Sequence, residues 1–171
     1  MIISIITISL MGTLLHFTYD FSGHNKFVGI FSAVNESTWE HIKLGLTPTF
    51  IWSLIDGFVY GSNSNYFLAK FISLVIVIVL IPVLFYGYKI LLRREILIFD
   101  ILIFYIAIIC SQLAFYFTLG IKSLGFIVSY ISCVGLFIIF GGYMMHTLMP
   151  AKNFLFKDPI SNKYGYYGHK N

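Results

Sequence analysis

The sequence contains few charged residues for its length. Only 11% of its 171 residues are Asp, Glu, Lys or Arg, whereas about 25% is usual in soluble domains. Hydrophobic residues make up 58%, aromatic residues make up 19%, and the mean hydropathy is +0.88. A soluble fold could not keep so many apolar side chains away from water. The composition therefore indicates a membrane protein whose outer surface faces lipid.

Cysteine and catalytic sequence patterns are also scarce. Cys110 and Cys133 lie inside apolar runs without the spacing of a metal or redox motif, so we expect buried thiols rather than a disulfide. The sequence contains no Gly-x-Ser-x-Gly, P-loop or dinucleotide-binding pattern. It contains no Arg-rich helix of the voltage-sensor type. The small positive net charge of +4 does not call for a nucleic-acid partner.

Five apolar runs are long enough to cross a bilayer, which takes about 20 helical residues. They cover residues 2–17, 66–92, 96–119 and 124–149, with a further run that begins near Asn35 or Ser37 and ends near Tyr60. Residues 27–34 are apolar but too short to cross, and we expect them at the membrane interface. The sequence thus predicts an all-α, polytopic membrane helix bundle over residues 1–150. Residues 151–171 form a cytoplasmic or interfacial tail.

Basic residues are distributed unevenly between the two sides of this bundle. Only Lys70 and Lys122 fall on the side of the N-terminus. The other nine are Lys26, Lys43, Lys89, Arg93, Arg94, Lys152, Lys157, Lys163 and Lys170. Loops rich in Lys and Arg stay in the cytoplasm, so we predict an external N-terminus and a cytoplasmic C-terminus. Membrane lipids with anionic headgroups are the expected partners of this charge.

The second span opens with a dense polar cluster, Asn35-Glu36-Ser37-Thr38-Trp39-Glu40-His41-Ile42-Lys43. Ionisable groups at the edge of the hydrocarbon are costly and usually face partners, water or a ligand. Ser37 and Glu40 fit a capping box, in which each side chain binds a free backbone N–H group at the helix start. That structural interpretation explains Glu36, His41 and Lys43 poorly, so the cluster is the predicted working site.

Helical geometry places four polar residues of this span on one stripe: Glu36, Glu40, Lys43 and Thr47. His41 points away from that stripe. Pro48 frees the carbonyl of Leu44, which is tolerated where a helix lines a cavity. We therefore predict a polar pocket that faces the cytoplasm, with Glu36 and Glu40 as candidate catalytic residues.

Other polar residues share this membrane level by depth alone. The candidate binding residues are His16, Asp20, His41, Lys43, Asp100, His146 and Asp158. Asp158 belongs to the tail, which is either anchored at the lipid interface or forms a lid over the pocket. Candidate ligands for a divalent metal such as zinc are His16, Glu36, Glu40 and His146, although no cofactor is certain. Asp56 stands apart, and we interpret it as an interfacial acid that reaches the outer water.

Two segments resemble a known pattern: Asn35-Glu36-Ser37-x-Trp39-Glu40-His41, and Phe156-Lys157-Asp158-Pro159-Ile160 followed by Tyr164-Gly165. Together they look like an uncharacterised family of small multi-pass bacterial membrane proteins. The resemblance covers most of the chain. It implies a bacterial cytoplasmic (inner) membrane and a pocket with a tail, and it transfers no catalytic residue.

Three functions remain open. In the first, Glu36, Glu40 and Lys43 bind a small molecule or ion, or relay protons for transport. Five spans without an inverted repeat would then need a homo-oligomer or a partner membrane subunit. In the second, the protein is a metal-dependent intramembrane enzyme, hydrolase-like, that acts on a lipid or membrane-delivered substrate. In the third, it is a non-catalytic assembly factor or partner subunit whose charges form ion pairs.

Overall fold

The computed structural model describes residues 1–168, and its regular elements are all helices. The five long helices are α1 (Ile2–Phe21), α3 (Thr38–Tyr60), α4 (Tyr66–Leu92), α5 (Leu97–Gly120) and α6 (Phe126–Leu148). The short α2 (Lys26–Phe31) follows α1, and a 3-10 turn, η1 (Gly165–Gly168), ends the described tail. All five long helices are long and apolar enough to cross a membrane. The predicted all-α bundle with five spans is confirmed.

Helix bounds follow the predicted spans closely except at the end of the first. α1 continues to Phe21, about one turn beyond the predicted end, and so carries Asp20 in its last turn. Gly23 then adopts a positive φ of 66°, which ends the helix. The short apolar segment forms α2, where the Asn25 side chain accepts hydrogen bonds from the Phe27 and Val28 N–H groups.

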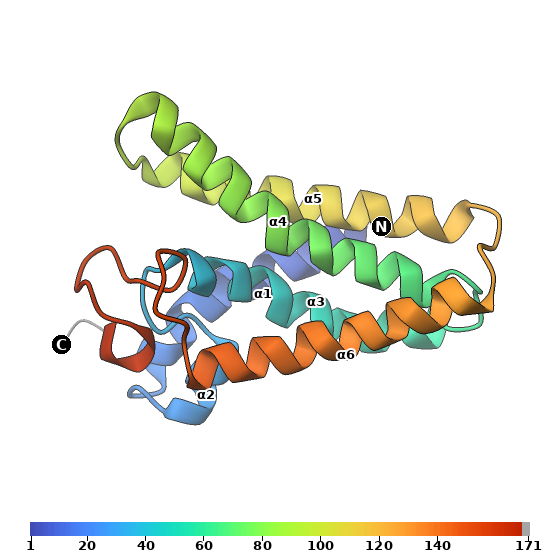
Figure 1. The fold of residues 1–171 in the computed structure, drawn as a ribbon, viewed down its shortest axis with the longest axis horizontal. Helices are drawn as coiled ribbons and strands as arrows, with labels where there is room; N and C mark the ends of the chain where they lie inside the picture. Colours follow the sequence, from blue (N-terminus) through green and yellow to red (C-terminus); the bar gives the residue numbers. More distant parts are fainter. Residues whose placement is uncertain (169–171) are drawn as a thin grey trace.

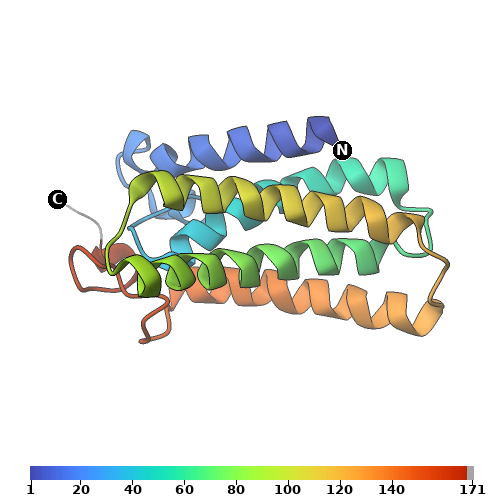
Figure 2. The same ribbon diagram turned by 90° about the horizontal axis from the view of Figure 1, so that it is seen from above.

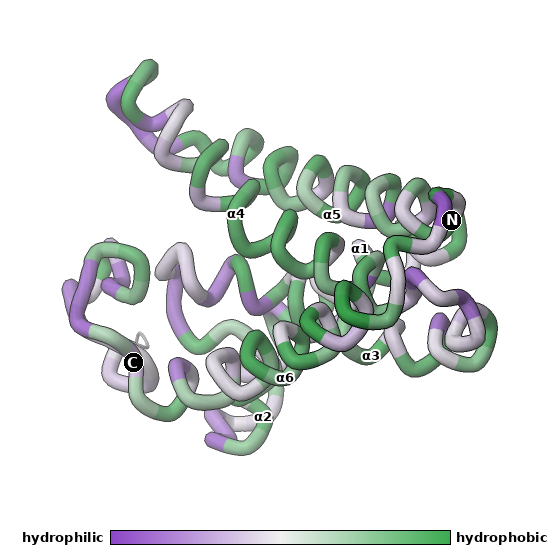
Figure 3. The backbone as a smooth tube through the Cα atoms, turned by 45° about the vertical axis from the view of Figure 1, so that its right-hand side comes forward, coloured by the Kyte–Doolittle hydropathy of each residue, from purple (hydrophilic) through white to green (hydrophobic). Residues whose placement is uncertain are grey.

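The long helices run side by side, and α1 and α6 lie at opposite edges of the bundle (Figure 2). α4 and α5 form a hairpin that diverges from the other helices at the end where the tail packs (Figure 1). Hydrophilic segments gather at the two ends of the bundle, and hydrophobic segments fill the length between them (Figure 3). This distribution is the one expected where lipid surrounds the middle of the molecule.

α3 lies at the centre of the bundle. Half of its apolar window is buried inside the protein, compared with 11% for α6. The core around it includes Ile42, Leu46, Val77 and Ile108. α1 approaches α3 closely at Gly12, where an added Cβ would lie 2.6 Å from the Leu44 carbonyl oxygen. The carbonyl that Pro48 frees therefore packs against a glycine rather than lining a cavity.

Two of the eleven basic residues are not surface charges. Lys43 and Lys70 are 0% and 1% exposed inside the bundle, so neither belongs to a membrane face as predicted. Seven of the remaining described basic residues surround the end where the tail packs, and Lys122 alone lies in the loop at the other end (Figure 1). Lys170 lies outside the described residues. The uneven charge distribution that motivates a cytoplasmic tail thus persists without the buried lysines.

We expect cysteine labelling to reveal this orientation. Cys110 and Cys133 are both half-buried and would first be replaced by Ala. A membrane-impermeant maleimide should then label Ser62→Cys in intact cells, because Ser62 is exposed in the α3–α4 loop. Lys152→Cys, exposed after α6, should react only after the membrane is opened. The reverse pattern would show that the tail is external.

Candidate functional site

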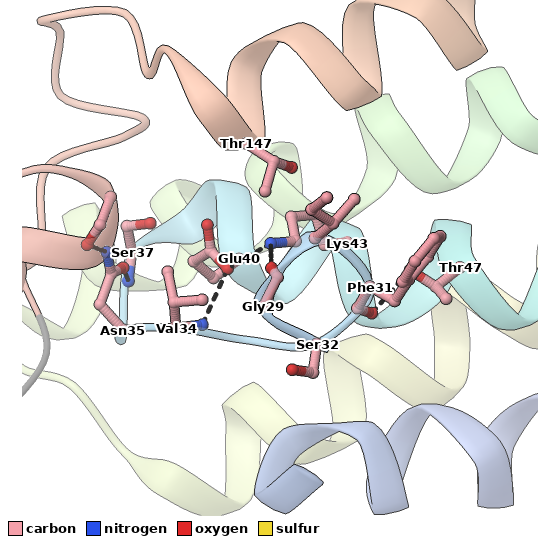
Figure 4. Close-up of polar contacts among 12 residues, drawn as sticks. Gly29, Phe31, Ser32, Val34, Asn35, Ser37, Glu40, Lys43, Thr47 and Thr147 are labelled. Atoms are coloured by element: carbon pink, nitrogen blue, oxygen red, sulfur yellow. Dashed lines mark hydrogen bonds and ion pairs between the residues drawn. The ribbon is translucent and has the colours of Figure 1, made fainter. Parts of the chain in front are cut away.

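The Glu40 and Lys43 side chains form an ion pair inside the bundle (Figure 4). Lys43 Nζ lies 2.9 Å from Glu40 Oε2, and both side chains are almost fully buried. Lys43 also donates to the Gly29 carbonyl at 2.8 Å, and Glu40 accepts from the Val34 N–H group at 3.0 Å. The pair therefore joins α2 and the loop before α3 to α3 itself.

The predicted capping box is wrong in its hydrogen bonds, although Ser37 occupies the N-cap position of α3. The Ser37 side chain makes no capping hydrogen bond, and the Glu40 carboxylate turns to Val34 and Lys43 instead. Other groups accept from the N–H groups at this helix start: the Ser37 N–H group donates to Asn35 Oδ1 at 2.8 Å, and the Trp39 N–H group donates to the Leu155 carbonyl of the tail at 2.9 Å.

The polar stripe of α3 continues to Thr47 and serves to hold α2. The Thr47 hydroxyl donates to the Phe31 carbonyl at 2.9 Å, and the Tyr143 hydroxyl of α6 donates to the Ile30 carbonyl at 2.7 Å. The two hydroxyl oxygens lie 2.7 Å apart. These bonds satisfy carbonyl groups at the C-terminal end of α2, which would otherwise be unpaired in the interior.

The tail is docked on the loop that precedes α3. The buried Asp158 carboxylate accepts from the Glu36 N–H group at 3.0 Å and from the Ser161 N–H group at 2.6 Å. The Asn35 amide of this loop donates to the carbonyl of Gly165, which lies near the described end of the tail, at 2.9 Å. Asp158 thus lies beside the polar cluster, where its contacts are backbone N–H groups, and its role as a binding residue stays a prediction.

His146 is part of the same docking surface. Its ring stacks on Phe156 of the tail with centroids 5.1 Å apart, and it lies 5.5 Å from the Trp39 ring. Because a carbonyl can only accept, His146 Nδ1 donates to the Gly142 carbonyl at 2.8 Å. His146 therefore anchors aromatic packing between α6, α3 and the tail.

Glu36 lies between two imidazoles, on the loop before α3 rather than on the helical stripe. Its carboxylate oxygens lie 3.9 Å from His16 Nε2 and 3.7 Å from His41 Nε2. His41 Nδ1 donates to the Ser37 carbonyl at 3.0 Å, so Nε2 of a neutral His41 presents a lone pair to Glu36. The Glu36 carboxylate therefore faces two imidazole nitrogens rather than a Lys or Arg side chain.

Glu36 opens onto a cleft of about 480 Å³ at the end of the bundle where the tail packs. Its ionisable lining residues are three acids and two imidazoles: Asp20, Glu36 and Asp158, with His16 and His24. The Asp20 carboxylate and the His24 ring lie 3.5 Å apart. The C-terminal end of α1, which has the negative end of the helix dipole, also adjoins the cleft. Among the described residues that line the cleft, none is Lys or Arg.

Comparison with known sequences identifies a family. Residues 1–166 match the sequence model of a family described as "Family of unknown function (DUF6512)". The chain belongs to this DUF6512 family. The predicted resemblance to an uncharacterised family is thereby confirmed, while the bacterial origin stays a prediction. No curated protein and no solved structure matches the chain.

Asp100, a further predicted binding residue, lies away from the cleft. Its carboxylate accepts a hydrogen bond from the Tyr88 hydroxyl at 2.5 Å, within the diverging α4–α5 hairpin. A small cavity of about 20 Å³ separates it from α3, with Thr38 and His41 on the facing side. His41 thus lies between Glu36 on one side and the Asp100 region on the other.

The four predicted metal ligands do not lie together at one site. Within residues 1–168, no three His, Cys, Asp or Glu side chains are arranged to hold a metal ion. Of the four predicted ligands, His16 and Glu36 are close to each other. Glu40 is paired with Lys43, and His146 packs on the tail. Zinc or a similar ion stays a prediction for which these contacts provide no geometric support.

A second buried ion pair in the DUF6512 chain corrects the interpretation of Asp56. Asp56 is 2% exposed and pairs with Lys70 of α4, so it does not reach outer water. The sequence carried a signal for this pair. The turn at residues 61–65 makes α3 and α4 an antiparallel hairpin, and an acid and a base stand on its two arms at similar distances from that turn. Opposite charges inside adjacent spans usually pair.

Proposed function

We propose that this integral membrane protein binds a small organic cation in the cleft beside Glu36. The observation that carries the proposal is the Glu36 carboxylate, which is 45% exposed, lines the cleft and lies 3.7 Å from His41 Nε2, the acceptor nitrogen of a neutral ring. A cation in the cleft would be attracted by this exposed carboxylate. The other acids of the cleft act in the same direction, because each lowers the electrostatic energy of a positive ligand.

The size and lining of the cleft favour an organic ammonium group. The volume of about 480 Å³ falls within the range of small-molecule sites. Phe17 contributes an aromatic ring to the lining, and aromatic rings attract quaternary ammonium groups. The positive-inside prediction would open this cleft to the cytoplasm. Passage of the ligand across the membrane would then need a homo-oligomer, as the small number of spans suggests.

Tetramethylammonium is a suitable probe because it carries a fixed positive charge. We expect detergent-purified protein to bind it measurably by calorimetry at pH 8. Glu36→Gln should weaken binding by about tenfold or more, which corresponds to roughly 1.4 kcal/mol for one charge contact in a partly screened site.

Glu95→Gln is the matched control, since Glu95 is a half-exposed acid that pairs with Lys89 outside the cleft. It should bind tetramethylammonium as the wild type does. Neutral tert-butanol, a ligand of similar size without charge, should not compete. Equal affinities for the Glu36→Gln variant and the wild type would contradict the proposal.

A non-catalytic assembly role is the second candidate, and one observation favours it. Most polar side chains of the 35–41 segment make internal contacts: Asn35 and Glu40 bind backbone groups, and Trp39 packs on the tail. The Glu36 side chain is the exception, because it is 45% exposed and faces the cleft. The assembly role would be favoured if a Glu36→Gln variant replaces the wild type in cells without loss of function and a membrane partner co-purifies with it.

A further inference from the structure

The Asp56–Lys70 pair is buried deep in the spanning part of the bundle. Both residues are at most 2% exposed, and Lys70 Nζ also lies 3.9 Å above the Phe115 ring. Removing two charges from water is costly, and well-packed apolar residues often stabilise a protein as much as a buried ion pair does. Ionisable pairs inside spans therefore usually mark ion or proton routes.

The two buried pairs of α3 lie in opposite halves of the bundle. Asp56 follows Glu40 by sixteen residues on the same helix, which corresponds to about 24 Å along its axis. Glu40 and Lys43 lie close to the cleft, because Glu40 binds Val34, a lining residue. Asp56 lies toward the other end, where α3 turns into α4 (Figure 1).

Buried polar groups of α4 and α5 continue inward from the second pair. The Ser73 hydroxyl, one turn after Lys70, lies 2.7 Å from the Ser111 hydroxyl. Gln112, next to Ser111, is fully buried, and neither its amide nitrogen nor its amide oxygen has a hydrogen-bond partner among the described residues. Ser9 of α1 has an unpartnered buried hydroxyl as well. Unpaired polar atoms in an interior are rare and indicate where water or a transient partner binds.

Other titratable groups beside this pair are tyrosines. Tyr66 of α4 and Tyr116 of α5 are within electrostatic range of the Asp56 carboxylate, and Tyr60 of α3 packs against Tyr116. Tyrosine side chains are ordinarily uncharged near pH 7, so the charge of the site depends on Asp56 and Lys70.

We propose that Asp56 and Lys70 pass protons through the bundle, so that cation movement in the cleft is coupled to proton movement in the opposite direction. This inference rests on the proposed cation site. A proton that enters from the α3–α4 end binds the Asp56 carboxylate and breaks the ion pair. The Lys70 ammonium then releases one proton toward Ser73 and Ser111, which leaves a neutral acid and a neutral amine. Transfer of the Asp56 proton to Lys70 restores the charged pair, and one proton has moved inward.

Liposomes that contain the purified protein test this coupling. They are loaded with tetramethylammonium and the pH dye pyranine and then diluted into medium free of the cation. Tetramethylammonium has no titratable proton, so it cannot carry one across the bilayer. The wild type should acidify the interior as the cation leaves. The Asp56→Asn, Lys70→Met double variant removes both charges together and avoids an unpaired buried ion. Its acidification rate should fall to that of protein-free liposomes.

Calorimetry on the same preparations separates the two proposals. The double variant should still bind tetramethylammonium as the wild type does, because the pair lies far from the cleft. A Glu95→Gln, Lys89→Met variant removes the half-exposed ion pair as a matched control and should acidify like the wild type. Binding without acidification by the wild type would overturn the coupling and leave the cation site standing. Undiminished acidification by the double variant would also overturn it, and a wild type that binds no cation would overturn both proposals.

Discussion

Lys43→Met should lower the free energy of unfolding by about 3–5 kcal/mol, the cost typical of breaking a buried ion pair by removing one partner. The substitution leaves the Glu40 carboxylate in the interior, where it still accepts a hydrogen bond from the Val34 N–H group. It also removes the donor that satisfies the Gly29 carbonyl of α2. Both losses fall on the contacts that hold α2 to α3, so that end of the bundle should open first on heating.

Thermal unfolding in detergent, followed by the exposure of a cysteine introduced at Val28, would measure the loss. A double variant, Glu40→Gln with Lys43→Met, should recover much of the stability because no buried charge remains. Lys89→Met breaks a half-exposed pair with Glu95 and should change stability by about 0.5 kcal/mol or less. A double variant less stable than Lys43→Met would show that Glu40 does not depend on Lys43 for its charge balance.

The sequence predicts the helices well because each span is limited by signals within a few residues of its ends. The run of Gly, Ser and Asn at residues 61–65 separates α3 from α4, and their observed bounds coincide with the predicted ones or lie within a few residues. α1 is the exception. Its last turn contains Asp20, a polar residue that hydropathy assigns to a loop although helical geometry accepts it.

The site is harder to predict because its geometry depends on one backbone turn. A continuous helix from Asn35 would place Glu36 and Glu40 on one stripe, whereas α3 begins at Thr38 and the two acids separate. Glu40 turns inward to Lys43, and Glu36 turns toward His16 and His41. The segment itself is identified by its density of ionisable groups, but the assignment of each acid requires knowledge of where the helix starts.

Contacts between distant segments are the part that local patterns omit. The tail supplies the Leu155 carbonyl to the start of α3, which replaces the predicted role of the Ser37 side chain. Asp56 and Lys70 stand on different spans, and each alone resembles an interfacial charge. The positive-inside rule applies to basic residues in the loops, so a lysine buried inside the bundle carries no information about membrane orientation.

Asp158→Ala should release the tail from the bundle. The Asp158 carboxylate is 1% exposed and accepts from two backbone N–H groups, those of Glu36 and Ser161. Hydrogen bonds to a charged acceptor contribute about 1.5–3 kcal/mol each, so their joint loss exceeds what a short docked segment can tolerate. Limited proteolysis should cut the variant after Lys157 or Lys163 much faster than the wild type, while the five spans remain intact.

The exposed neighbour Lys163 provides the control. Lys163→Gln removes a charge of the tail but keeps the backbone bond in which the Lys163 carbonyl accepts from the Asp158 N–H group. This variant should lose one cleavage site and otherwise resist protease like the wild type. Release of the tail also removes one wall of the cleft, so Asp158→Ala should bind tetramethylammonium more weakly. If Asp158→Ala instead resists protease and binds the cation normally, the aromatic packing of Phe156 on Trp39 and His146 is sufficient to dock the tail.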